Sequence, residues 1–166
     1  AYVIFGKAAG FQTIDLTTVP AADGFILNGS SAGRLAGQSV SSAGDVNGDG
    51  FDDVIVGVPL GDHLAPDVGE AYVVFGKAEG LGFVNLFQVA PPDGFIIVGD
   101  ATGDDLGSSV SSAGDVNADG FDDLIVGARY NDRAGAAVGA AYVVFGKASG
   151  FARFLEVASL SPADGF

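Results

Sequence analysis

Short segments rich in β-branched and aromatic residues recur along the whole chain, each bounded by Gly, Asp, Asn or Pro. Such segments predict β-strands. We expect four of them in the first part of the chain, at 24–29, 38–44, 53–58 and 70–76, with counterparts that begin near 94, 108, 123 and 140. Either a short strand or a turn of helix fits three further segments, 11–19, 81–89 and 151–160. No helical period is long enough to predict an α-helix, so the predicted fold class is all-β.

The same segments return at a fixed spacing. The motif at 1–7 returns at 71–77 and at 141–147, and 39–47 returns unchanged at 109–117, each time 70 residues further on. Four antiparallel strands joined by short connections are typical of a β-propeller blade. A parallel β-helix is the alternative, but its stacked coils are much shorter than this period.

The repeat divides the chain into four parts. Residues 1–23 are expected to be the outer strand and connection of a preceding blade. Residues 24–93 and 94–164 are each expected to form a complete blade, and 165–166 to begin another. The predicted fold is therefore two complete blades of four antiparallel strands plus one orphan strand.

The sharpest chemical signal is an Asp-rich loop that occurs twice, at 45–53 and 115–123. Oxygen-bearing side chains occupy positions 1, 3, 5 and 9, position 6 is Gly, and the Phe at position 7 offers its backbone carbonyl. Ca²⁺ takes about six to eight oxygen ligands, and alternate residues of a tight turn point to its concave side. The sequence therefore predicts two Ca²⁺ ions, one for each loop. The predicted ligands of the first are Asp45, Asn47, Asp49, Phe51 and Asp53, and those of the second are Asp115, Asn117, Asp119, Phe121 and Asp123.

Two other interpretations of these loops are weaker. An EF-hand requires helices on both sides and a Glu at the twelfth position, where this chain has Val56 and Val126. Simple hairpin turns also use Asn-Gly and Asp-Gly pairs, but two nearly identical copies with the same oxygen donors favour a metal site. Asp52 and Asp122, at position 8, are expected to point away from the ion.

Composition narrows the possible partners. The chain has 7 Lys and Arg against 21 Asp and Glu, a net charge of −14, which argues against nucleic acid and anionic membranes and is compatible with divalent cations. No apolar run approaches the roughly 18 residues of a membrane span, so membrane insertion is not expected. The chain has no Cys, which excludes disulfides, thiolate zinc sites and Cys nucleophiles.

At these residues the chain resembles the FG-GAP repeat family. The first repeat shows Phe25 to Gly29, the loop at 45–53, and then Gly57-Val58-Pro59. The second has Phe95 to Gly99 and its own loop, but Gly127-Ala128-Arg129 lacks the Pro. The resemblance implies blades like those of the integrin α-subunit head, with Ca²⁺ on one face. It extends to the repeat arrays of large secreted bacterial proteins, so an extracellular or cell-surface location and a bacterial source are expected.

The function implied by the resemblance is a non-enzymatic adhesion, cell-surface or structural assembly module. Two alternatives stay open, a lectin-like propeller that binds glycans and a blade fragment of a larger secreted enzyme. Lectin sites need aromatic residues repeated at equivalent positions, but Tyr130 corresponds to Leu60. His63 is the only histidine and corresponds to Arg133, and the Ser-rich strands offer no identifiable base, so no catalytic residue is expected.

The partners follow from the architecture. A blade has two apolar faces that neighbours must cover, and repeat folds need about three or more units for stability. We therefore expect further blades of a longer chain, or neighbouring subunits, to cover both ends, and a protein or glycan to be the ligand.

Overall fold

The computed structural model describes residues 1–10, 12–29, 31–63, 65–78, 81–133 and 138–166. In this part of the chain the regular elements are β-strands and two short 3₁₀ helices, so the prediction of an all-β fold is confirmed. The strands are β1 (Tyr2–Ile4), β2 (Gly24–Asn28), β3 (Ser39–Gly44), β4 (Asp53–Val58), β5 (Glu70–Val74), β6 (Phe83–Asn85), β7 (Gly94–Val98), β8 (Leu106–Gly114), β9 (Asp123–Ala128), β10 (Ala140–Val144) and β11 (Phe154–Glu156). The two 3₁₀ helices are η1 (Leu86–Gln88) and η2 (Val157–Ser159). Neither of these helices has the length and apolar character needed to cross a membrane.

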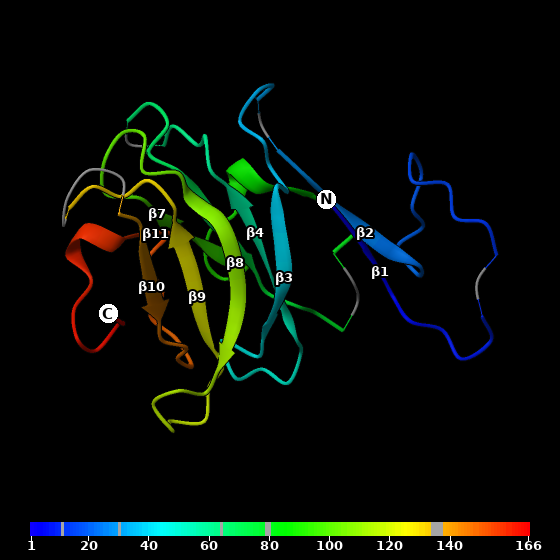
Figure 1. The fold of residues 1–166 in the computed structure, drawn as a ribbon. Coiled ribbons are helices and arrows are strands. Elements are labelled where there is room, and N and C mark those ends of the chain that lie inside the picture. The colour runs from blue at the N-terminus through cyan, green and yellow to red at the C-terminus, as the bar shows by residue number, and fades with distance from the viewer. Residues whose placement is uncertain (11, 30, 64, 79–80, 134–137) are drawn as a thin grey trace.

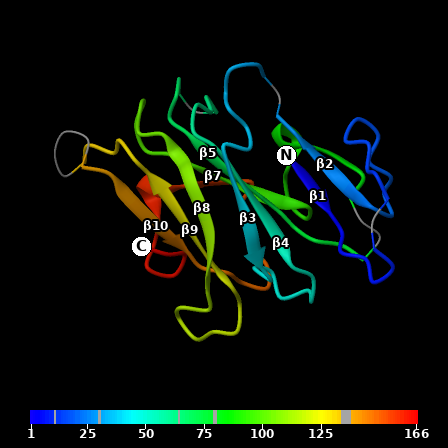
Figure 2. The ribbon, with the colours of Figure 1, turned by 45° about the vertical axis from the view of Figure 1, so that its right-hand side comes forward.

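Three sheets are stacked face to face (Figure 1). The central sheet has the order β11-β7-β5-β4-β3, and its four strands from β7 to β3 are antiparallel. Strands β10, β9 and β8 lie over one of its faces, with β8 beside β3, and β1 and β2 lie over the other (Figure 2). A stack of sheets built mainly from antiparallel strands is the arrangement that propeller blades adopt.

The strand that was expected to open each repeat belongs to the sheet of the preceding repeat. β2 pairs with β1, placing Ile26 opposite Tyr2, and β7 pairs with β5, placing Ile96 opposite Tyr72. The expectation that 24–29 shares a sheet with 38–44 is therefore wrong. A period of 70 residues is the same whichever neighbours pair, so the spacing alone does not fix the grouping.

One sheet of the described residues has four antiparallel strands, and two such blades were expected. It runs from β3 to β7, residues 39–98, and is out of phase with the repeats at 24–93 and 94–164. The sheet β10-β9-β8 has a bridge between Val144 and Gly165 where a fourth strand would lie.

Two further strands lie in the segments 81–89 and 151–160, which the sequence left open, and each of them is parallel to its partner. β6 pairs with β2, placing Phe83 opposite Ile26, and β11 pairs with β7, placing Phe154 opposite Ile96. A 3₁₀ helix follows each of these strands directly. Two of the three segments left open by the sequence, 81–89 and 151–160, thus contain both a strand and a helical turn, and their strands pair with β2 and β7. The described residues of the third segment, 12–19, form neither.

Side chains of the central strands point alternately to the two faces of the sheet and so contribute to two hydrophobic cores. Ile55, Phe95 and Ile97 face the core shared with β8–β10, whereas Val56 and Ile96 face the core shared with β1 and β2. Every residue of β7 is buried, which explains its unbroken apolar sequence, since both of its faces are covered.

Candidate functional site: two Asp-rich loops

The two Asp-rich loops join equivalent strands at the same end of neighbouring sheets. The loop at 45–53 joins β3 to β4, and the loop at 115–123 joins β8 to β9 (Figure 1).

The Asp45 carboxylate accepts hydrogen bonds from the backbone N–H groups of Gly48 at 2.8 Å, Asp49 at 3.0 Å and Gly50 at 2.9 Å. Asp115 likewise accepts from Asp119 at 3.1 Å and Gly120 at 2.9 Å. The position 1 carboxylate therefore closes each loop around itself.

Positions 3 and 5 lie next to the position 1 carboxylate. The N–H of Asp49 donates both to Asp45 Oδ1 and to Asn47 Oδ1, the latter at 2.9 Å, so these two side-chain oxygens share one donor. Asn47 Nδ2 donates to Asp49 Oδ2 at 2.9 Å. Asn117 and Asp119 repeat these contacts in the second loop, at 3.0 Å and 2.8 Å. Three oxygen-bearing side chains are thus gathered on one turn of each loop.

The carboxylate at position 9 is buried and joins the loop to the next strand. Asp53 Oδ2 accepts from the N–H of Val46, and its Oδ1 accepts from the N–H of Gly76, both at 2.9 Å. Asp123 makes the same pair of contacts, with Val116 and Gly146.

Burial, and then the nearby charges of Asp49 and Asp45, raise the pKa of Asp53 to about 7, although the two backbone hydrogen bonds oppose the rise.

The chemistry of this donor set fits Ca²⁺. Three carboxylates and one amide oxygen are hard ligands, and the charges of Asp45 and Asp49 already bear on Asp53. The orientation of the side chains is that of a hydrogen-bonded turn. In the part of the chain that the structure describes, no group of three or more His, Asp or Glu side chains converges at metal-binding geometry. Calcium binding by the ten predicted ligands therefore stays a prediction.

The loops touch each other through Asp122, at position 8 of the second loop. Asp122 Oδ2 accepts a hydrogen bond from the N–H of Asp45 at 2.9 Å, and the N–H of Asp122 donates to the carbonyl of Asp45 at 3.2 Å. The N–H of Lys147 donates to the carbonyl of Val46 at 2.9 Å. Position 8 does point away from its own loop, as expected, but in the second loop it contacts the first. The identical sequences Asp52-Asp53 and Asp122-Asp123 gave no sign of this difference.

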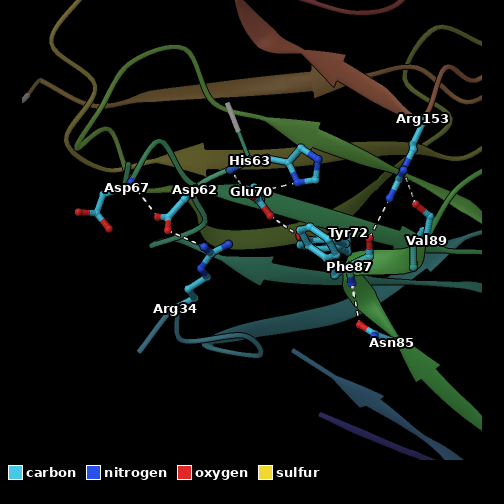
Figure 3. A network of polar contacts seen from close by, with 10 residues as sticks. All are labelled: Arg34, Asp62, His63, Asp67, Glu70, Tyr72, Asn85, Phe87, Val89 and Arg153. Carbon is cyan, nitrogen blue, oxygen red and sulfur yellow. Dashed lines mark hydrogen bonds and ion pairs between the residues drawn. The ribbon is translucent and has the colours of Figure 1, made fainter. Parts of the chain in front are cut away.

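A second polar cluster lies at the opposite end of the central sheet, around buried Glu70, the first residue of β5 (Figure 3). Glu70 Oε1 accepts from the N–H of His63 at 2.7 Å, and Tyr72 donates its hydroxyl to Glu70 Oε2. The His63 ring lies between Phe87 and Phe154, with ring centroids 5.4 and 4.2 Å away, and its Nδ1 is 3.9 Å from Glu70 Oε1. His63 is thus held in a packed, aromatic position. Sequence reasoning missed Glu70, because the second repeat has Ala140 in its place.

Comparison with known families matches the parts of the chain that hold these loops. The FG-GAP repeat model matches residues 36–74 and 106–144. The second range begins with β8 and ends with β10, and the first ends with β5. Each match therefore contains one Asp-rich loop and the three strands around it, in phase with the sheets.

Curated animal proteins show similarity over most of the chain. Integrin alpha-3 of Mus musculus is 30% identical over 128 residues, which is 77% of this chain and 11% of that protein. Integrin alpha-PS5 of Drosophila melanogaster is 37% identical over 128 residues, 75% of this chain and 11% of that protein. Integrin alpha pat-2 of Caenorhabditis elegans is 36% identical over 131 residues, 71% of this chain and 10% of that protein. The chain spans about a tenth of the length of these relatives, and they give no support to the expected bacterial source.

Proposed function

Because this chain carries two FG-GAP repeats and is similar to integrin alpha chains, we propose that it is a calcium-binding propeller segment with a non-enzymatic role in adhesion or structural assembly at the cell surface or outside the cell. The observation that carries the proposal is the pair of equivalent loops, each with three carboxylates and one amide at the same positions. Within one loop the like charges repel, and a divalent cation relieves that repulsion.

In this proposal Asp45, Asn47, Asp49 and Asp53 hold the first ion, together with the carbonyl of Phe51. Asp115, Asn117, Asp119 and Asp123 hold the second with the carbonyl of Phe121. Calcium supplies a hard, doubly charged centre that neutralises most of the charge in each loop. The chain supplies the rest of the site, because the buried position 9 carboxylate, bonded to Gly76 or Gly146, fixes the loop to the adjacent strand.

We propose that further blades of the same propeller are partners of this segment. A cleft of about 490 Å³ lies between the β1–β2 sheet and the central sheet, lined by Phe5, Phe25, Val40, Phe51 and Asp52 among others. In the second repeat the residues equivalent to Phe51 and Asp52 contact the first repeat, through Gly48 and Asp45. The internal equivalence thus supports another repeat as the natural cover of this cleft.

Isothermal titration with CaCl₂ tests the proposal. The sample is the chain in its assembled form, after bound metal has been removed with a chelator. We expect two sites for the native sequence and one site each for Asp49→Ala and Asp119→Ala, because the loops lie on separate sheets. Asp132→Asn, which alters an exposed carboxylate outside both loops, is the matched control and must keep both sites. An absence of binding at millimolar calcium would refute the proposal.

A further inference from the structure

We propose that Asp122 couples the two calcium loops, so that filling one loop strengthens calcium binding at the other. The inference rests on the proposed function, and it deepens that function by assigning a regulatory contact between the sites. Asp122 itself is a positioning residue, since its carboxylate contacts the backbone of the neighbouring loop and not the proposed ion.

The contact connects two proposed ligands, Asp123 and Asp45, through one peptide bond and two hydrogen bonds. Asp122 precedes Asp123, whose carboxylate is buried at position 9 of the second loop. The Asp122 carboxylate accepts a hydrogen bond from the N–H of Asp45 at 2.9 Å, and the Asp122 N–H donates to the Asp45 carbonyl at 3.2 Å. Asp45 is position 1 of the first loop. Any ordering of Asp123 by an ion is therefore passed to the backbone that aims the Asp45 carboxylate.

Glycines in the first loop show how closely the second loop approaches it. A Cβ at Gly44 would overlap the Asp122 carboxylate, and a Cβ at Gly48 would overlap the Phe121 ring. The equivalent Gly114 has open space around it, and the residue equivalent to Gly48 is Ala118. The close approach thus involves a specific surface of the first loop.

The burial of equivalent residues in the two loops shows the same close approach of the second loop to the first. Val46 is fully buried in the core shared with β8–β10, whereas its counterpart Val116 is 51% exposed. Asp52, which occupies position 8 of the first loop, is exposed and lines the apolar cleft. The two Asp side chains have the same sequence neighbours and different surroundings, so Asp52 is a natural control for Asp122.

The expected sign of the coupling follows from linkage. A loop that is held in one geometry loses less conformational freedom when it binds an ion, so the second ion binds more tightly than the first. Coulomb repulsion between the two ions acts in the opposite direction, but the water and salt around these largely exposed loops screen it. The net effect is positive cooperativity, and by reciprocity each ion strengthens the other equally.

A thermodynamic cycle by isothermal titration with CaCl₂ measures the coupling. The product of the two association constants of the native chain is divided by the product of the single-site constants from D49A and D119A. We expect a ratio of at least about 5 for the native chain. The ratio should fall toward about 1 in a D122A background, because the acceptor for the Asp45 N–H is gone and only the backbone hydrogen bond to the Asp45 carbonyl is kept. It should persist in D122N, which keeps an oxygen acceptor, and in D52A.

The titration results distinguish a failure of calcium binding from a failure of the coupling between the two loops. No binding at either loop would refute the proposed function and the coupling with it. Two sites with a native ratio of 1, a ratio unchanged by D122A, or an equal loss in D52A would refute the coupling alone. A calcium-free measurement adds a check, since amide exchange at Asp45 in EGTA must be faster in D122A than in the native chain, and equal rates would contradict the contact.

Discussion

The carboxylate of Asp53 accepts a hydrogen bond at 2.9 Å from the backbone N–H of Gly76, so the end of one Asp-rich loop is tied to the chain just after the neighbouring strand. We expect Asp53→Asn to lower the free energy of unfolding by about 1–3 kcal/mol even without calcium, because the amide turns an N–H toward a buried N–H donor. Urea denaturation in EGTA measures the change. Asp52→Asn alters the adjacent, exposed carboxylate and should have little effect, and equal losses in the two variants would contradict this role.

Gly48 and Phe121 should be energetically coupled. An alanine at residue 48 meets the Phe121 ring, although Ala118 holds a similar positive φ in the other loop, 60° against 74°. Gly48→Ala is expected to cost about 1–3 kcal/mol of stability in the native background and less in a Phe121→Ala background. Urea denaturation of the four chains gives the coupling energy, and an additive result would mean that the ring does not rest on Gly48.

The buried pair Glu70 and Tyr72 predicts sensitivity to alkali. Burial, the hydrogen bond to Glu70 and the charge on Glu70 raise the pKa of the Tyr72 phenol above its ordinary value of 10.0. Above that pH the unfolded chain ionises at this residue while the folded chain keeps its proton, so the free energy of unfolding falls as the pH rises.

Tyr72→Phe should remove this contribution to the alkaline loss. The variant should also cost about 1.5–3 kcal/mol at pH 8, because a hydrogen bond to a buried carboxylate is lost. Urea denaturation at pH 8 and pH 11 compares it with the native chain and with Tyr130→Phe, whose ring is 51% exposed. An identical fall with pH in the native and Tyr72→Phe chains would contradict the prediction.

The uncovered cleft predicts self-association of the isolated 166 residues. Val40 and Phe51 are 54% and 42% exposed beside it, and among the described strands β1 pairs with β2 alone. Size-exclusion chromatography with light scattering should show oligomers or aggregates, and Val40→Lys should reduce them. Val138→Lys, which changes a 60% exposed valine outside the cleft lining, is the control. A well-folded monomer with a sharp thermal transition would contradict the prediction.

Much of the fold could be predicted because local pattern determines local structure. Alternating apolar positions predicted the strands, and the strand at 53–58 has the predicted bounds. The sheet partners could not be predicted, since the 70-residue period is unchanged when each outer strand moves to the preceding sheet. The parallel pairing of β6 and β11 was missed for a similar reason, because a segment of three residues carries no signal of its partner's direction.

The loops were predictable as units and their surroundings were not. The spacing of Asp45, Asn47 and Asp49 indicated a turn with converging oxygens, and the structure places these side chains together. The different roles of Asp52 and Asp122 arise from which repeat lies next to each, and this information is absent from the local sequence. Glu70 was not predicted as a site residue, because the prediction relied on residues that recur in both repeats and this buried acid occurs in only one of them.

Calcium itself is tested most directly by a crystal structure of the assembled chain grown in CaCl₂, with anomalous diffraction used to locate the ions. We expect one anomalous peak in each loop, with oxygens of Asp45, Asn47, Asp49 and Asp53 about 2.3–2.6 Å from the first ion and those of Asp115, Asn117, Asp119 and Asp123 equally close to the second. Loops that carry no peak at millimolar calcium, with the Asp45 carboxylate still bonded to the backbone of Gly48 and Gly50, would contradict the account.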